Sequence, residues 1–189
     1  MKKTILYCGT IAIIALTACN NTKTETSDAT KETAQASGPM VMDLENKGLD
    51  GLDVTITVPD SLGKKMTFTK SKYSGALDIM AGDNYQMILT SESADEDQPI
   101  DSSMASTMNT VKYNNDPSTA KHIINEPRLF MWSAQDNDGK TAYHFYATFP
   151  DPKNKGRYFS FGDKDGVLYS EAAIRSMIEV AKTIKSKGV

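Results

Sequence analysis

Cysteine is scarce in this sequence of 189 residues: it occurs only as Cys8 and Cys19, both close to the start of the chain. Frameworks of several disulfides and zinc sites built on paired cysteines are therefore excluded from the remainder. Histidine is nearly as rare, since only His122 and His144 occur, and they lack the H-E-x-x-H spacing of zinc proteases. We expect no metal ion and no cofactor, and we expect the folded part to depend on its hydrophobic core.

Long apolar runs are also missing, apart from residues 5–16 near the start. This run is shorter than the roughly 20 apolar residues that a transmembrane helix needs, and Lys2 and Lys3 precede it. A basic start followed by a short apolar run is typical of a secretory signal peptide. The sequence therefore favours a leader over residues 1–18 that is removed on export, rather than a permanent transmembrane anchor.

The leader ends in Leu16-Thr17-Ala18-Cys19, which resembles the lipobox of bacterial lipoproteins. The resemblance implies cleavage before Cys19 and attachment of acyl chains, palmitate among them, to that cysteine. Several chains together give stable anchoring, because each buried methylene contributes about 0.8 kcal/mol. The alternative interpretation of Cys19 is a free, buried thiol. We expect a lipid-anchored protein of the cell envelope, and Asn20 with the Lys- and Glu-bearing segment after it favours the outer over the inner membrane.

The segment after Cys19 contains Thr, Asn, Ser, Lys and Glu, but no Val, Ile, Leu or aromatic residue up to residue 38. Such a segment cannot bury enough apolar surface to offset the entropy lost on ordering. We therefore expect a lipidated cysteine and disordered linker over residues 19–38, followed by one globular domain over residues 39–189. Without the leader, 19 basic residues face 24 acidic ones, a formal charge of −5. A mildly acidic chain without a basic cluster makes nucleic acid an unsuitable partner.

Alternation of apolar and polar residues predicts a mostly antiparallel sheet. One such strand is the run from Leu52 to Val58. Two runs flank Gly82-Asp83-Asn84, a group suited to a tight hairpin turn. A short strand is expected at residues 66–68, and a three-stranded meander at residues 128–133, 141–149 and 157–161. Residues 118–125 suit either a short helix or the start of a strand.

Two helices are expected, one in the middle of the chain and one at its end. Asp97 and Pro99 form a capping region for a helix with Ile100, Met104, Met108 and Val111 on one face. Ser170 can cap a second, amphipathic helix, whose apolar stripe is Ile174, Met177, Ile178, Ala181 and Ile184. The fold class is therefore α+β, a single domain with an antiparallel sheet and both helices packed largely on one face. This order of elements resembles the small α/β/α sandwiches of the PsbP and Mog1-like proteins; the resemblance concerns architecture and implies no function.

Motifs for catalysis are few. No G-x-S-x-G elbow occurs, and the S-x-x-K matches at residues 61–64 and 118–121 lack the S-D-N and K-T-G motifs that accompany them in penicillin-binding enzymes. Acidic groups at residues 95–97, 136–139 and 163–166 lack the full calcium-loop pattern, so turn formation accounts for them better. We find no catalytic residue in the sequence.

An aromatic group on the predicted meander is the one candidate site. Strand alternation places Tyr143, Phe145, Ala147 and Phe149 on one face, which we expect to be core, and His144 and Tyr146 on the other. Trp132 and Tyr158 come within reach of His144 and Tyr146. These four side chains, Trp132, His144, Tyr146 and Tyr158, suit recognition of a sugar, a peptide or a protein. The alternative is that they only cover the second side of the sheet beneath the other helix or a loop.

The sequence therefore favours a membrane-tethered envelope lipoprotein whose domain binds or scaffolds an envelope protein, peptide or glycan and is not an enzyme. Alternatives are an accessory protein that binds a glycan or small ligand, and an immunity-type protein. A small envelope enzyme would need a pocket that joins His122 or His144 to a carboxylate or a hydroxyl group.

Overall fold

The computed structural model describes residues 38–49, 53–71, 76–94, 97–115, 120–136 and 138–188. The chain divides into two units, residues 1–35 and 36–189, and all described helices and strands belong to the second. The expected leader, Cys19 and almost all of the expected linker lie outside the described residues. None of the helices in the described part combines the length and apolar character that a bilayer crossing needs.

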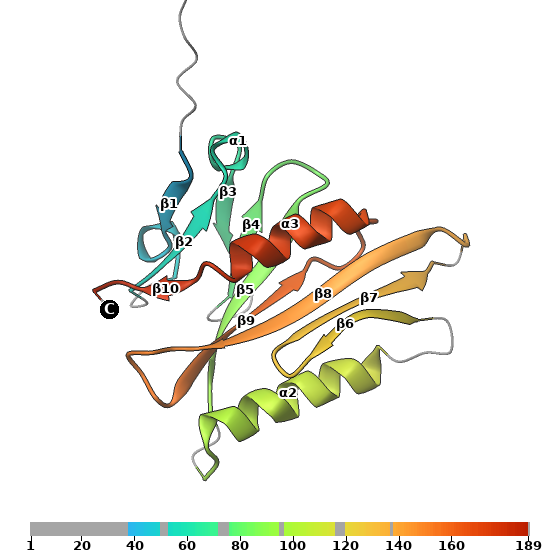
Figure 1. Ribbon diagram of the computed structural model, residues 1–189. Helices are drawn as coiled ribbons and strands as arrows, with labels where there is room; N and C mark the ends of the chain where they lie inside the picture. The colour runs from blue at the N-terminus through green and yellow to red at the C-terminus, as the bar shows by residue number, and fades with distance from the viewer. Residues whose placement is uncertain are drawn as a thin grey trace, which may run out of the picture. The chain divides into compact units, whose positions relative to one another are not determined.

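Seven strands form one antiparallel sheet in the order β3-β4-β5-β9-β8-β7-β6 (Figure 1). The hairpin and the meander expected from the sequence are both confirmed, and the segment left open contains an edge strand. The strands are β3 (Thr67–Lys70), β4 (Ala76–Met80), β5 (Gln86–Ser93), β6 (Lys121–Glu126), β7 (Leu129–Gln135), β8 (Thr141–Pro150) and β9 (Arg157–Asp163).

A smaller, three-stranded sheet contains the first and last strands of the folded unit. It pairs β1 (Met40–Asp43) and β10 (Lys185–Ser186) with the two edges of β2 (Val54–Val58). The alternation expected for β2 is confirmed, because Val54, Ile56 and Val58 are buried. The short helices η1 (Glu45–Lys47) and α1 (Asp60–Gly63) follow β1 and β2 respectively.

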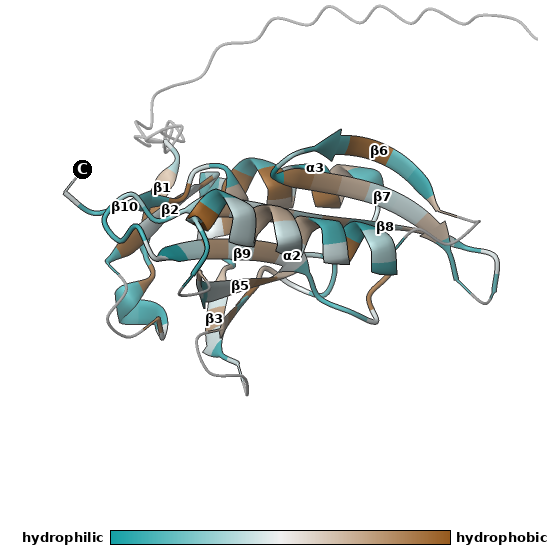
Figure 2. Cartoon of the chain, turned by 90° about the horizontal axis from the view of Figure 1, so that it is seen from below, coloured by the Kyte–Doolittle hydropathy of each residue, from teal (hydrophilic) through white to brown (hydrophobic). Residues whose placement is uncertain are grey.

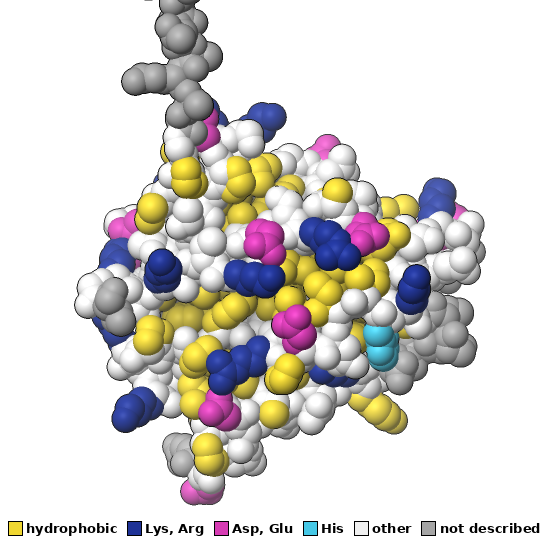
Figure 3. All heavy atoms as spheres, in the orientation of Figure 1, with side chains coloured by type: hydrophobic (Ala, Val, Ile, Leu, Met, Phe, Trp, Pro, Cys, Tyr) yellow, Lys and Arg dark blue, Asp and Glu magenta, His cyan; other side chains and the backbone are white. Residues whose placement is uncertain are grey.

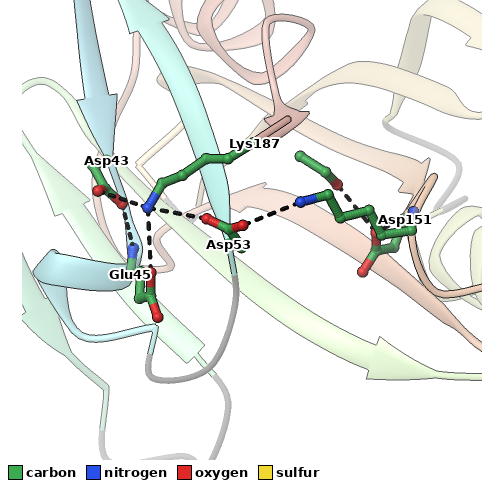
Figure 4. Close-up of polar contacts among 7 residues, drawn as sticks. Asp43, Glu45, Asp53, Asp151 and Lys187 are labelled. Carbon is green, nitrogen blue, oxygen red and sulfur yellow. Dashed lines mark hydrogen bonds and ion pairs between the residues drawn. The ribbon is translucent and has the colours of Figure 1, made fainter. Parts of the chain in front are cut away.

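An ion cluster joins the C-terminal strand to β1 and β2 (Figure 4). The Lys187 ammonium lies 2.7 Å from Asp43 Oδ2, 3.1 Å from Asp53 Oδ1 and 3.2 Å from Glu45 Oε2. The hydrogen bond from Lys187 lowers the pKa of Asp43, and those from Lys153 and Lys187 lower the pKa of Asp53. The cluster thus ties the end of the chain to the first hairpin.

The longer helices cover opposite faces of the large sheet. Helix α3 (Glu171–Ala181) begins at Ser170, whose hydroxyl accepts a hydrogen bond from the Ala173 amide, and it packs on the face that carries Phe145, Phe159 and Phe161. Helix α2 (Ile100–Asn114) packs through Met108 against Phe130 and Trp132, and strand alternation puts these two rings on the other face.

The α+β prediction is confirmed, but the expectation that both helices pack largely on one face is wrong. Strand parity sends the side chains of Phe145 and Tyr146 to opposite faces, and each helix covers one of them. The capping of α2 also differs: its N-cap is Pro99 and no side chain caps it, so Asp97 does not have that role. The expected strand near Phe68 is confirmed as β3, at residues 67–70.

Candidate ligand-binding cavity between α2 and the sheet

The two faces of the large sheet differ in polarity. The α3 face is formed by buried apolar residues such as Leu89, Met131 and Phe161. The α2 face of the central strands carries polar residues instead, namely Thr90 and Glu92 on β5, Tyr158 and Ser160 on β9, and His144, Tyr146 and Thr148 on β8. A face this polar cannot be closed by an apolar helix without a large desolvation cost. Helix α2 suits this polar face. Few residues of the helix are buried, and hydrophilic positions are mixed with hydrophobic ones along its length (Figure 2).

Helix α2 closes this face only in part. Its apolar residues Met108 and Val111 pack on the β7 side, against Phe130 and Trp132. Towards β5 and β9 a cavity of about 350 Å³ remains, at the small end of the roughly 300–1,000 Å³ typical of ligand pockets. Its lining is Ile88, Thr90, Glu92, Val111, Asn115, Trp132, His144, Phe145, Tyr146, Ser160, Gly162, Asp163 and Asp165.

Gly162 lines the floor of this cavity and has no side chain to fill it. It lies within β9, between Ile88 on β5 and Tyr146 on β8. A Cβ atom at this position would lie 3.4 Å from Tyr146 Cδ2 and 3.6 Å from the Phe145 carbonyl oxygen, which is ordinary contact. The backbone therefore tolerates a side chain here, and the glycine leaves open space that a larger residue would fill.

One end of the cavity is formed by the Glu92 carboxylate, which accepts hydrogen bonds from three hydroxyl groups. Tyr158 donates to Oε2 at 2.8 Å, and Ser160 and, at 3.4 Å, Tyr146 donate to Oε1. Thr107 of α2 lies 2.9 Å from the Tyr158 hydroxyl and links the helix to this arrangement. Burial raises the pKa of Tyr146, so its hydroxyl stays protonated and able to donate.

The other end is formed by His144 and Asp163, whose Nδ1 and Oδ2 atoms lie 2.8 Å apart. The second carboxylate oxygen, Oδ1, accepts from the Phe145 amide at 2.7 Å, beside the last ladder pair of β8 and β9. The Asp163 side chain is 4 % exposed, whereas that of His144 is 24 % exposed. The hydrogen bond to Asp163 raises the pKa of His144 against the opposing effect of burial, and the charge of Asp165 raises it further.

An aromatic row forms the wall on the β7 side. The Trp132 ring is stacked on Phe130, with centroids 4.7 Å apart, and on His144, with centroids 5.4 Å apart. Trp132 is only 7 % exposed, so little of its ring is free to stack on a ligand. It serves the cavity chiefly as an apolar wall that orients His144.

The four side chains singled out from the sequence lie on one face, as strand alternation requires. Trp132, His144 and Tyr146 line the cavity. Tyr158 does not; it is 3 % exposed and contacts the site through its hydrogen bond to Glu92. The alternative is that these residues only lie beneath a helix or loop. It holds for the buried Trp132 and Tyr158, but His144 and Tyr146 are only half-buried.

Sequence reasoning missed Glu92 and Asp163 as site residues. Glu92 follows Ile88 and Thr90 at the same strand parity, so a longer reading of β5 would have placed it on this face. Asp163 stood in a group interpreted as a turn, and the turn does occur at Asp165 and Gly166, where φ of Gly166 is +82°. No signal in the sequence indicates that Asp163 bonds to His144, because 19 residues separate them.

The cavity carries more negative than positive charge. Its acidic and basic lining residues are Glu92, Asp163, Asp165 and His144, and no lysine or arginine lines it. Within the described ranges no group of three metal-ligating side chains comes together. On the face drawn in Figure 3, acidic and basic side chains alternate, so the negative character belongs to the cavity rather than to that surface.

Comparison with known proteins finds similarity in structure but not in sequence. The sequence matches no known protein-family model, and no curated protein sequence is significantly similar to it. The Ran-binding protein Mog1p of Saccharomyces cerevisiae is similar in structure over 79 % of this chain and 95 % of its own, with a TM-score of 0.45 and 8 % identity.

A mutant of Mog1 gives a TM-score of 0.46 at 9 % identity, over 79 % of this chain and 96 % of its own. A protein from Bacteroides thetaiotaomicron gives 0.40 at 11 % identity, over 71 % of this chain and 45 % of its own length. At these scores and identities, the likenesses say nothing about the partner or activity of this protein.

Proposed function

We propose that this protein is a lipid-anchored component of the cell envelope whose folded domain binds a small ligand and is not an enzyme. The binding part rests on one observation, the open cavity of about 350 Å³ on a polar sheet face. A sheet face that served only as core would carry apolar residues, as the opposite face does. Departures from that pattern are expected at functional sites.

The anchoring part of the proposal rests on the sequence. The lipobox-like Leu16-Thr17-Ala18-Cys19 follows a basic start and a short apolar run, which is the arrangement of a lipoprotein leader. The polar segment up to residue 38 would let the domain stand away from the lipid headgroups. A binding protein held in this way can collect a ligand at the membrane without leaving the envelope.

The binding proposal is tested by what the protein carries. The full chain is purified from its native membranes and denatured, and released small molecules are identified by mass spectrometry. A stoichiometric ligand is expected from the wild type and not from Gly162→Val, because the added side chain fills the cavity floor. Gly156→Val, in an exposed turn, is the matched control and should retain the ligand. If Gly162→Val releases as much ligand as the wild type, the ligand binds elsewhere. If neither the wild type nor either variant releases a ligand, the proposal is rejected.

The anchoring proposal is tested separately. The full-length protein should enter the detergent phase on Triton X-114 partition, and its N-terminal peptide should carry the mass of acyl chains. Cys19→Ser should move the protein to the aqueous phase, because the sulfur that accepts the lipid is lost. A lipid-free N-terminal peptide from wild-type membranes would reject the anchor.

A second candidate function, acid–base catalysis, is favoured by the His144–Asp163 pair. This pair meets the condition set for an envelope enzyme, a cavity that joins a histidine to a carboxylate. Ser160 is not its nucleophile, since its hydroxyl donates to Glu92. If the released ligand is converted by fresh protein, and His144→Gln abolishes the conversion, catalysis replaces simple binding.

A further inference from the structure

The Glu92 carboxylate has no counter-ion in the part of the chain that the structure describes. Its two oxygen atoms accept hydrogen bonds from Tyr146, Tyr158 and Ser160, all of them neutral donors. Among the described residues, no lysine, arginine or histidine forms an ion pair with it. Three hydroxyl groups fix the position of the carboxylate but do not neutralise its charge.

The surroundings of Glu92 favour a positive charge beside it. The residue is only partly exposed and faces the cavity, whose remaining acidic residues are Asp163 and Asp165. His144 is the only lining residue able to become positive, and it bonds to Asp163 at the other end. An anion such as phosphate or a carboxylate would meet repulsion at the Glu92 end, because electrostatic interactions are stronger where water is partly excluded.

We infer that the ligand of this cavity is a small organic cation, whose ammonium or guanidinium group pairs with Glu92 while its carbon chain lies over Gly162. This inference rests on the proposed binding function and specifies its ligand class. The ring of Tyr146 suits such a ligand, because aromatic rings attract cations and also pack against methylene groups, and Trp132 adds an apolar wall. A ligand oxygen or nitrogen can still reach Glu92, since a carboxylate offers about four acceptor positions.

A matched set of probes separates charge from shape. The probes are 1,5-diaminopentane, 1,5-pentanediol and glutarate, which all contain five carbons and carry two ammonium, two hydroxyl or two carboxylate groups respectively. Trp132 is the single tryptophan of the chain and lines the cavity, so its fluorescence reports on this site alone. The detergent-purified full chain is titrated with each probe at low ionic strength, and isothermal titration calorimetry repeats the measurement.

We expect the diamine to cause a saturable change in fluorescence, with much weaker effects from the diol and from glutarate. Glu92→Gln should weaken diamine binding by about tenfold or more, because removing one partner of a partly desolvated charge pair is costly. Glu126→Gln removes the same charge from an exposed position on β6 and should leave the affinity unchanged. Circular dichroism of both variants checks that the fold is retained.

Other outcomes overturn the inference in distinguishable ways. Equal binding of diol and diamine would indicate a neutral, sugar-like ligand, and stronger binding of glutarate an anionic one; either leaves the binding function intact. Diamine binding that Glu92→Gln does not weaken would remove Glu92 from the site. If no probe binds and native protein releases no ligand, both the inference and the proposed function fail.

Discussion

Single residues at the two ends of the cavity are held by different kinds of hydrogen bond. At one end, neutral hydroxyl groups surround a carboxylate, and at the other a carboxylate bonds to an imidazole and to a backbone amide. Both carboxylates therefore stabilise the fold as well as shape the site. Their removal should be measurable as a change in stability even without a ligand.

Glu92→Gln should lower the free energy of unfolding by about 1–3 kcal/mol, because charge-assisted hydrogen bonds become neutral ones and the new NH₂ group cannot accept. Urea unfolding followed by circular dichroism measures this difference. Glu126→Gln, on the exposed edge strand, should change the value by less than about 0.5 kcal/mol. Equal effects of the two substitutions would mean that the hydroxyl cradle contributes nothing.

His144 should make stability depend on pH in a defined direction. Its pKa is raised above 6.5 in the folded protein by Asp163, so the protonated form stabilises the fold. The stabilisation should be fully present below about pH 6.5 and should be lost as pH rises through the folded pKa. The difference in unfolding free energy between wild type and His144→Gln, measured by urea at a series of pH values, should shrink over that range. A difference that grows with pH would contradict the assignment.

Among the helices and strands, α2 and α3 differ in how apolar they are, and they cover opposite faces of the large sheet. Helix α3 has a continuous buried stripe and closes the main core, whereas α2 buries chiefly Met104 and Met108 and leaves space above β5 and β9. The two helices also begin differently, since only α3 has a side-chain cap. Stability should therefore be sensitive to the start of α3.

Ser170→Ala should lower the free energy of unfolding by about 1 kcal/mol, because the hydroxyl that accepts from the Ala173 amide is lost. Ser170→Asp keeps an acceptor at the same place and should retain most of the stability. Urea unfolding of the three proteins provides the test. If the alanine and aspartate variants are equally stable, the cap is not formed.

Lys187→Met should loosen strand β10, because three carboxylates lose their shared ammonium group. Hydrogen exchange of the amide of residue 187, which donates to the Asp53 carbonyl in the wild type, should become faster, and more so at low salt. Lys182→Met, which affects one exposed pair on α3, serves as the control. Unchanged exchange would show that the cluster does not stabilise the strand.

At the scale of the whole molecule, the hydrophobic core described here lies entirely after residue 36. We expect the segment before it to add reach but no stability. A chain that starts at Ala36 should therefore unfold within about 0.5 kcal/mol of one that starts at Asn20. Thermal and urea unfolding of the two chains measures this. A clearly less stable short chain would show that the preceding segment packs on the domain.

The sequence alone determined much of the local structure. Alternation fixed β2, the β4–β5 hairpin and the meander, because a strand with one core face must repeat every two residues. A stripe repeating every three to four residues predicted the C-terminal helix, although Ile184, the last residue expected on that stripe, lies beyond the end of α3 at Ala181. Strand parity placed His144 and Tyr146 together on one face of the sheet.

Only the tertiary structure decided which face each helix covers and which distant groups meet in the cavity. Glu92 and Ser160 are 68 residues apart, and His144 and Asp163 are 19 apart, so local periodicity carries no information about either pair. The small sheet likewise brings together both ends of the folded unit. Such contacts arise when the chain buries its apolar surface as a whole, and a sequence pattern that describes one segment at a time does not contain them.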